Sequence, residues 1–322
     1  MQLQRRDLLA LFGAACTSAV WAQSAFPSKA LRIVVPFGAG GVADLTARTV
    51  GQKLSQTLGQ PVVIENKPGA GGVGAADTVA KAAPDGHTLL LMSNASAVTA
   101  TLFNKLPYDT VKDFTPVSTL GFFDIAVVTA AESKFKTLAD VLAYAKAHPG
   151  QLNVGSINIG STQNLAAELF KSNAGVDMQI VPFNGTPAVV NALRGGQIDV
   201  AVEIVSPIVG QIKGGALRAL AVTSEQRSVV LPEVPTTREA GLPRYQASSW
   251  NALAVPSGTP KDVVTRLHRE IVSALSDPEV SKKMRELNIE PRGMGPEQTA
   301  TFLQSEIRRW GEVIVKANIP RQ

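Results

Sequence analysis

A glycine-rich loop between an expected strand and an expected helix is the feature of this sequence best suited to chemistry. The apolar run Leu31 to Val35 is followed by Gly38-Ala39-Gly40-Gly41, and an amphipathic stretch begins near Asp44. Glycines let a backbone approach a ligand closely, and free N–H groups at a helix N-terminus carry partial positive charge. We therefore predict an anion site here, formed by Phe37, Gly40, Gly41 and Asp44. Asp44 either organises the loop or bonds a donor group of the ligand.

The same loop leaves a second interpretation open. Gly38, Gly40 and Ala43 fit the pattern G-x-G-x-x-A, and Glu65 stands at about the spacing of a ribose-binding acid. This pattern is typical of NAD(P)-dependent oxidoreductases. Against it, Pro36-Phe37 places a stiff corner before the glycines, and an exported protein meets little free dinucleotide. We favour the anion site and keep an exported oxidoreductase as the alternative.

A second loop, Gly155 to Thr162, also leads from an expected strand into an expected helix. Its hydroxyl groups can cap the helix or contact a ligand. If this loop faces the first one across a cleft, two helix N-termini would hold one anion from opposite sides. The residues predicted to bind on this side are Ser156, Gly160, Ser161 and Thr162.

Polar side chains follow three further strands, at the edge where open α/β sheets bind ligands. Ser93 and Asn94 come after one strand, Asn184 after another, and Glu203 closes a third. We predict that these four residues contact the distal part of the ligand. The absence of an obvious arginine clamp favours a ligand that is net neutral or carries one carboxylate.

Composition excludes several other functions. The 322 residues carry a formal charge of +5, but no run of Lys or Arg exceeds two, so no nucleic-acid partner is expected. None of the three histidines, His87, His148 and His268, has a nucleophile partner or metal-ligand spacing. We therefore expect no catalytic residue, no metal and no cofactor, and the protein is not expected to be an enzyme.

The N-terminus has the features of a cleavable signal peptide over residues 1–22. Arg5 and Arg6 precede the mainly apolar stretch Leu8 to Val20, and Val20 and Ala22 suit a cleavage site before Gln23. The apolar stretch is too short to span a bilayer as a mature helix. Cleavage would remove Cys16, the only cysteine. The expected location is the periplasm.

Beyond the signal peptide, apolar runs alternate with amphipathic stretches, which indicates an α/β architecture. The length suggests two lobes, and we expect a first lobe over 23–124, a second over 125–224 and a return to the first, largely helical, over 225–322. Crossings are expected near Phe122 to Ala126 and near Thr223 to Ser228. Such paired crossings form a hinge that lets lobes close on a ligand.

Several motifs occur together along the chain in a fixed order. They are VVPF at 34–37 with Gly40-Gly41 and Asp44, VIENKPGAGG at 63–72, AAPDGHTLL at 82–90, LPYD at 106–109, GGQID at 195–199, LRALAVT at 217–223, VPT at 234–236, EAG at 239–241, and Glu306, Arg309-Trp310 and Lys316 to Ile319 in the last helix. Together they make the chain resemble the Bug-type solute receptors of tripartite tricarboxylate transporters.

The resemblance implies a periplasmic receptor of the two-lobe periplasmic-binding-protein type, similar to the type II Venus flytrap. It implies a monomer that captures a small organic carboxylate and hands it to the membrane subunits of a transporter. In that family the two predicted loops grip a carboxyl group, partly through backbone and water. Three departures from the family pattern border the expected pocket and leave the ligand's identity open: Gly38-Ala39, Asn164 and Glu203-Ile204.

Overall fold

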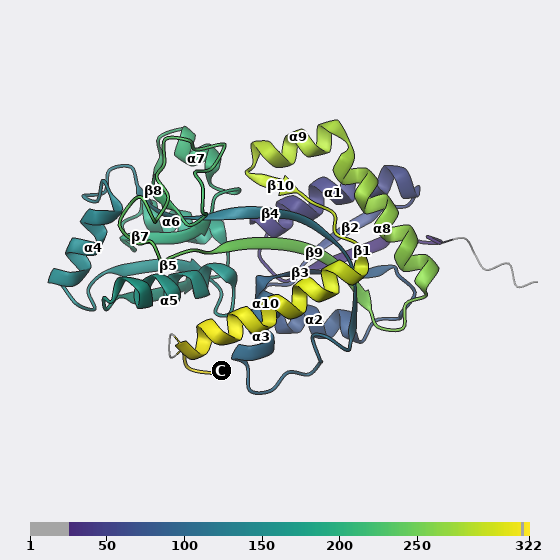
Figure 1. The fold of residues 1–322 in the computed structure, drawn as a ribbon. Coiled ribbons are helices and arrows are strands. Elements are labelled where there is room, and N and C mark those ends of the chain that lie inside the picture. The colour runs from purple at the N-terminus through teal and green to yellow at the C-terminus, as the bar shows by residue number, and fades with distance from the viewer. Residues whose placement is uncertain (1–25, 317–318) are drawn as a thin grey trace, which may run out of the picture.

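The structure is a computed structural model that describes residues 26–316 and 319–322. The expected signal peptide over 1–22 lies outside the described residues. Figure 1 shows two α/β lobes side by side, with the long strand β4 (Phe114–Ala130) running from one to the other. The α/β architecture with two lobes is as the sequence predicts.

Lobe 1 contains a sheet with the strand order β2-β1-β3-β9-β4, and β10 also pairs with β4. Strand β1 is parallel to β2 and β3, whereas β9 is antiparallel to β3 and β4. The strands are β1 (Leu31–Val35), β2 (Val62–Asn66), β3 (Thr88–Ser93), β9 (Ser248–Pro256) and β10 (Ile289–Pro291). The helical elements are α1 (Val42–Leu58), the 3-10 turn η1 (Ala70–Gly72), α2 (Val73–Ala80), α3 (Asn94–Leu102), α8 (Lys261–Ser276), α9 (Pro278–Glu286) and α10 (Pro296–Lys316).

Lobe 2 is built around the other half of β4, which pairs antiparallel with both β7 and β8. Strand β5 lies parallel between β6 and β7. The strands are β5 (Asn153–Ile157), β6 (Gln179–Phe183), β7 (Val200–Ile204) and β8 (Leu217–Val222). The helices are α4 (Leu138–Ala147), α5 (Thr162–Ala174), α6 (Thr186–Arg194) and α7 (Val209–Lys213).

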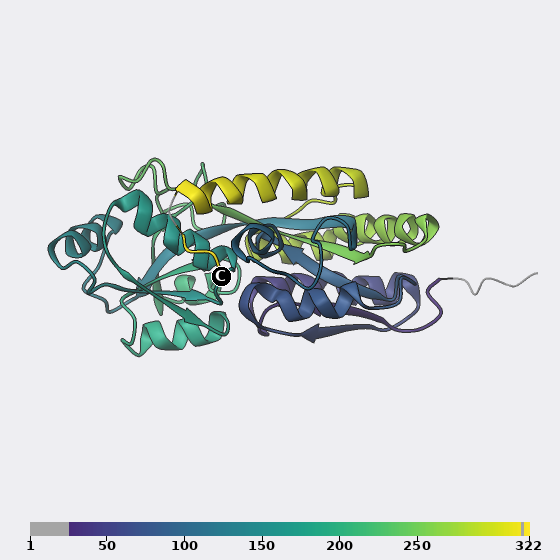
Figure 2. The same ribbon diagram turned by 90° about the horizontal axis from the view of Figure 1, so that it is seen from below.

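Successive side chains along the strands of lobe 1 pack into two separate hydrophobic cores, one on each face of the sheet. In β1, Ile33 and Val35 belong to the core that includes residues of α1 and α8, while Val34 belongs to the core that includes residues of α2 and α10. Successive side chains of a strand point to opposite faces, so both faces of this sheet need a helical cover. Figure 2 shows α10 along one face of the molecule, on the side away from β1 and α1.

The first connection between the lobes is a continuous strand. Within β4, Asp124 pairs with Ser248 of lobe 1, and the next residue, Ile125, pairs with Ile204 of lobe 2. The sequence predicts a crossing here, at Phe122 to Ala126, but not that one unbroken strand from Phe114 to Ala130 forms it. Hinge motion is absorbed by a few residues between the moving parts, and the residues of β4 at this crossing are in that position.

Strand β9 is an element that the sequence analysis misses. Its residues Trp250, Ala252 and Ala254 are buried in one core and Leu253 and Val255 in the other. A strand buried on both faces loses the alternation of polar and apolar residues that identifies most strands. The consequence is large for the site, because β9 lies in the middle of the lobe 1 sheet and reaches the seam between the lobes.

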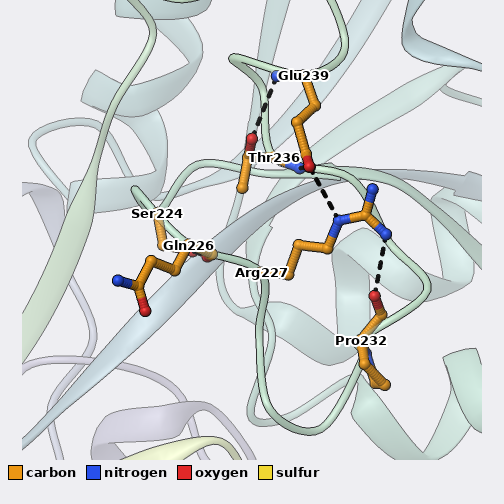
Figure 3. Close-up of polar contacts among 6 residues, drawn as sticks. All are labelled: Ser224, Gln226, Arg227, Pro232, Thr236 and Glu239. Atoms are coloured by element: carbon orange, nitrogen blue, oxygen red, sulfur yellow. Dashed lines mark hydrogen bonds and ion pairs between the residues drawn. The ribbon is translucent and has the colours of Figure 1, made fainter.

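The segment between β8 and β9 stays beside lobe 2 before it returns. The Val222 N–H donates to the Pro235 carbonyl at 2.9 Å, and the Thr237 N–H donates to the Val222 carbonyl at 2.8 Å. Figure 3 shows how Arg227 fixes this segment, since its guanidinium donates to Glu239 at 2.9 Å and to the Pro232 carbonyl at 3.1 Å. The returning strand therefore begins at Ser248, later than the expected crossing near Thr223 to Ser228.

A buried carboxylate ties α10 to the sheet. Glu306 is 6% exposed and accepts hydrogen bonds from the indole N–H groups of Trp250 at 3.3 Å and Trp310 at 3.2 Å. Replacing Glu306 with leucine is expected to lower the free energy of unfolding by about 1 to 3 kcal/mol, because both buried indoles lose their acceptor. Urea denaturation measures this loss. Unchanged stability would show that the two indole bonds contribute nothing to the fold.

Candidate functional site

A pocket lies in the seam between the lobes, at the carboxyl ends of strands from both sheets. It has an internal volume of about 20 Å³, which is room for about one or two water molecules when the lobes are in this arrangement. Its lining residues are Phe37, Gly38, Gly41, Val42, Ala43, Ser93, Phe123, Ser249 and Asn251 from lobe 1 and Ile157, Thr162, Gln163, Gly185, Thr186 and Ile204 from lobe 2.

The first wall of the pocket is the N-terminus of α1. Gly41 is the N-cap residue, it has no side chain to accept a bond from the first turn, and Val42 and Ala43 line the pocket. A helix start without a side-chain cap leaves backbone N–H groups available to a ligand, together with the positive end of the helix dipole. Phe37 forms part of the same wall, and its carbonyl accepts a bond from Asn66 at 3.0 Å.

Asp44 faces away from the pocket lining and organises the loop. Its carboxylate accepts bonds from the Gly40 N–H and from Arg48, both at 3.0 Å, and it is 3% exposed. Burial acts to raise the pKa of this carboxyl group, but the bonds from Arg48, Gly40 and Asn66 outweigh burial and hold the pKa below its usual value. These bonds are those of the loop-organising role, and contact of Asp44 with a ligand stays a prediction.

The second wall is the N-terminus of α5 in lobe 2. Ser161 caps this helix by accepting a bond from the Asn164 N–H at 3.1 Å, and Thr162 and Gln163 line the pocket. Ser156 lies behind this wall, where its hydroxyl accepts a bond from the Asn164 side chain at 3.3 Å. Ser156 and Ser161 thus shape the helix start and are fully buried.

The third wall is the N-terminus of α6, at the end of the loop after β6 in which the sequence predicts Asn184 as the contact residue. Gly185 is its N-cap residue and provides no side-chain cap, and Thr186 lines the pocket beside it. Asn184, which was predicted to contact the ligand, has an exposed side chain and is absent from the lining. The Pro182 to Pro187 loop does reach the pocket, but through the two residues that follow Asn184.

The lobes touch on both sides of the pocket through glycines. A Cβ atom on Gly38 would lie 2.8 Å from the Asn184 carbonyl oxygen, and one on Gly160 would lie 3.1 Å from the Gly71 Cα. The Gly71 N–H also donates to the Ile159 carbonyl across the seam at 2.8 Å. Gly160 therefore permits close approach of lobe to lobe, rather than of backbone to ligand, in this closed arrangement.

The back of the pocket is the sheet of lobe 1. Ser93 on β3 and Asn251 on β9 are paired across the strands, and both line the pocket. Ser249, also on β9, donates to the Thr162 hydroxyl of lobe 2 at 3.2 Å. Asn94 is fully buried beside Ser93, where its Nδ2 donates to the Ser248 carbonyl at 2.7 Å, and it does not line the pocket.

Glu203 is a fully buried carboxylate behind the lobe 2 walls. Its Oε1 accepts bonds from Gln163 Nε2 at 2.7 Å and from the Ile204 N–H at 2.9 Å. Burial raises the pKa of Glu203 to about 7, and the hydrogen bonds from Gln163, Ile204 and the Thr186 side chain offset only part of the effect. Glu203 is absent from the pocket lining, so it acts on the site through Gln163.

Four of the predicted site residues line the pocket: Phe37, Gly41, Ser93 and Thr162. The others support its walls or the seam. Four polar lining residues were missed: Gln163, Thr186, Ser249 and Asn251. Gln163 directly follows the predicted Thr162, and Thr186 lies two residues after the predicted Asn184, so extending each prediction into the first turn of the following helix would have found them. Ser249 and Asn251 were missed together with β9.

The alternative dinucleotide site lacks its acid. Glu65 forms ion pairs with Arg32 at 3.1 Å and Lys67 at 3.6 Å, and it does not line the pocket. Ala43 does reach the pocket with Gly38. The molecule instead has two lobes that share a strand and meet at a pocket lined by helix N-termini. This arrangement is that of the two-lobe solute-binding proteins.

Comparison with known proteins identifies the family. The chain belongs to the tripartite tricarboxylate transporter family receptors, whose family model matches residues 46–319. It is 37% identical to Protein BugT of Bordetella pertussis over 90% of this chain and 89% of that protein. The resemblance predicted from the motifs is thereby confirmed.

Solved structures share both fold and sequence with this chain. MatC of Rhodopseudomonas palustris, solved with bound malate, is 37% identical, has a TM-score of 0.84 and matches over 90% of this chain and 100% of MatC. Another R. palustris protein, solved with adipate, is 32% identical, has a TM-score of 0.88 and matches over 92% of this chain and 99% of that protein. The expected periplasmic-binding-protein fold is confirmed.

Proposed function

We propose that this receptor binds a small carboxylate between its lobes and delivers it to the membrane subunits of a tripartite tricarboxylate-type transporter. The observation that carries the proposal is the meeting of three helix N-termini, those of α1, α5 and α6, at one pocket. Each contributes lining residues from its first turn or cap: Val42 and Ala43, Thr162 and Gln163, and Gly185 and Thr186.

The pocket selects an anion without a charged side chain. No residue of its lining is Asp, Glu, Lys or Arg, so backbone N–H groups, helix dipoles and hydroxyl groups supply the attraction. The structures of MatC with malate and of the R. palustris protein with adipate support a carboxylate as the ligand of this chain too. Binding and hinge closure require no chemical step, so we propose a receptor without catalytic activity.

The proposal includes a periplasmic monomer that is exported by cleavage after Ala22. Within residues 26–316, no helix is long and apolar enough to cross a membrane. Mass spectrometry of the protein from a periplasmic fraction should give a chain that begins at Gln23. Size-exclusion chromatography should give the mass of one chain.

A thermal-shift screen tests the proposed function. The purified mature protein is mixed with monocarboxylates, dicarboxylates and NAD(P), one at a time. At about 100 times the Kd, a ligand of the folded state adds about 2.7 kcal/mol of stability, which raises the Tm measurably. We expect at least one carboxylate to do so. Stabilisation by NAD(P) with none by any carboxylate would contradict the proposal and favour the oxidoreductase.

A further inference from the structure

Glu203 contacts two of the polar side chains that lobe 2 contributes to the pocket. Gln163, in the first turn of α5, donates from Nε2 to Glu203 Oε1 at 2.7 Å. Thr186, the first residue of α6, hydrogen-bonds to the Glu203 carboxyl group through its side chain. Both Gln163 and Thr186 line the pocket, whereas Glu203 lies behind them. On this path a single side chain stands between the Glu203 carboxyl group and a ligand in the pocket.

The Thr186 hydroxyl group also lies beside the opposite wall of the pocket. A Cβ atom on Gly41, the N-cap residue of α1, would lie 3.7 Å from Thr186 Oγ1. This oxygen is therefore close to the N-terminus of α1 on one side and to Glu203 on the other. A carboxylate held by the N-termini of α1, α5 and α6 comes close to Glu203, and the two carboxyl groups share the positive ends of α5 and α6.

No cation of the described residues forms an ion pair with Glu203. Its carboxyl group is fully buried, and burial and hydrogen bonds set its pKa at about 7 without a contribution from a charged group. Two carboxylates that share a site oppose each other's ionisation, and an unpaired buried carboxylate is costly by itself. A bound ligand carboxylate is therefore expected to raise the pKa of Glu203 further, which favours its neutral form in the complex.

The other titratable and charged groups around Glu203 are few. On the elements packed against β7 they are Glu168 and Lys171 on α5, Arg194 on α6 and Asp124 on β4, and β5 carries none. The histidines lie on none of these elements. Across the seam, hydrogen bonds hold the pKa of Asp44 below its usual value, so it stays ionised at neutral pH. Burial raises the pKa of Glu168 and of Asp124, which makes these two residues the controls for Glu203.

We propose that the receptor takes up a proton at Glu203 when it binds its carboxylate, and that Glu203 is a positioning residue for the donors of lobe 2. Solvent supplies the proton. The neutral carboxyl group donates its O–H to Thr186 Oγ1, so the Thr186 hydroxyl hydrogen is free for the ligand. Ionised Glu203 accepts that hydrogen instead and adds a second negative charge. This inference rests on the proposed function, because it places a carboxylate at the helix N-termini.

Calorimetric titration of the mature protein at different pH values tests the coupling. The probes are propanoate, malate and adipate, whose carboxyl groups are largely ionised at pH 6.5 and above. Coupling between two sites typically changes affinity by about 5- to 150-fold. Since Glu203 of the free protein titrates at about pH 7, we expect the Kd of the tightest-binding probe to rise at least about threefold from pH 6.5 to pH 8.5.

Proton uptake is measured directly in the same way. At pH 7.5, titrations in phosphate and in Tris, which differ in ionisation enthalpy, should show uptake of at least about 0.3 proton per bound probe. This measurement needs no variant. Equal affinity at pH 6.5 and pH 8.5 without proton uptake would overturn the inference and leave the proposed function standing.

Glu203→Gln mimics the neutral form of the carboxyl group. We expect this variant to bind the same probe with less than about a 1.5-fold change in Kd from pH 6.5 to pH 8.5, and without proton uptake. A purely structural role of Glu203 would instead change the affinity equally at all pH values. The matched controls are Glu168→Gln and Asp124→Asn, which should keep both the pH dependence and the proton uptake.

Each remaining outcome has a distinct meaning. PH dependence that persists in Glu203→Gln, or that disappears in either control, would assign the proton to another group and overturn the inference. A folded Glu203→Gln that binds no probe at pH 6.5 would also overturn it. If this variant does not fold, Glu203→Met, which is also uncharged, is measured in its place. Binding of no carboxylate at any pH, in these titrations and in the thermal-shift screen, would overturn the proposed function as well.

Discussion

Replacing Gly38 with alanine is expected to weaken ligand binding by about 5- to 150-fold while leaving each lobe folded. The added Cβ atom would lie 2.8 Å from the Asn184 carbonyl oxygen of the opposite lobe, and the backbone there cannot rotate away. Overpacking a tight contact costs about 1 to 3 kcal/mol, which corresponds to this change in affinity when closure and binding are coupled. The backbone of Gly38 lies outside the left-handed region, so alanine causes no strain within lobe 1.

Calorimetric titration with the acid found by the thermal-shift screen measures the effect. Gly69→Ala is the matched control, because Gly69 also lies in a loop of lobe 1, has ordinary backbone angles and has no atom within 4 Å of an added Cβ. The control should bind as tightly as the unaltered protein. If Gly38→Ala also binds with unchanged affinity, then the bound state does not bring Gly38 against Asn184, and the closed arrangement is not the binding one.

Replacing Glu203 with glutamine is expected to change how stability depends on pH. In the unfolded chain this carboxyl group ionises near its ordinary pKa of 4.5, whereas burial raises the pKa in the folded state to about 7. Between these values the folded state binds the additional proton, so stability is fully present below about pH 4.5 and falls as the pH rises to about 7. The whole loss amounts to about 3 kcal/mol.

Glutamine cannot ionise, so this part of the pH dependence disappears in Glu203→Gln. Urea denaturation at pH 4 and pH 8 measures the free energy of unfolding. From pH 4 to pH 8, this free energy should fall by about 3 kcal/mol more in the unaltered protein than in the variant. The same substitution at Glu233, which is exposed, serves as the control and should follow the unaltered protein. Parallel pH dependence of Glu203→Gln and the unaltered protein would show that Glu203 ionises freely in the folded state.

Local sequence signals located the loops of the site because they act over short distances. The apolar run that forms β1, the glycines after it and the start of α1 are neighbours in the chain, and their order is enough to place a helix N-terminus at a strand end. The same holds for Ser161 and Thr162 at the start of α5. Phe37, Gly41, Ser93 and Thr162 could be predicted in this way.

Features that depend on pairing across long distances could not be predicted from the sequence. Asn251 reaches the pocket only because β9 inserts between β3 and β4, and no local pattern indicates that insertion. Gly160 was expected to contact a ligand and Gly38 lies in the predicted anion loop, but only the arrangement of the lobes shows that Gly71 and Asn184 lie against them. A related reason applies to Asn184, since its position in the loop does not reveal that Thr186, two residues later, lines the pocket while Asn184 does not.

A crystal structure of the receptor with its tightest-binding carboxylate tests the central claim most directly. The account predicts that the carboxylate lies between the N-termini of α1, α5 and α6, within hydrogen-bonding distance of backbone N–H groups from both lobes. It also predicts that the ligand forms no ion pair with lysine or arginine. A carboxylate held by such a side chain, or bound outside the seam between the lobes, would contradict the account.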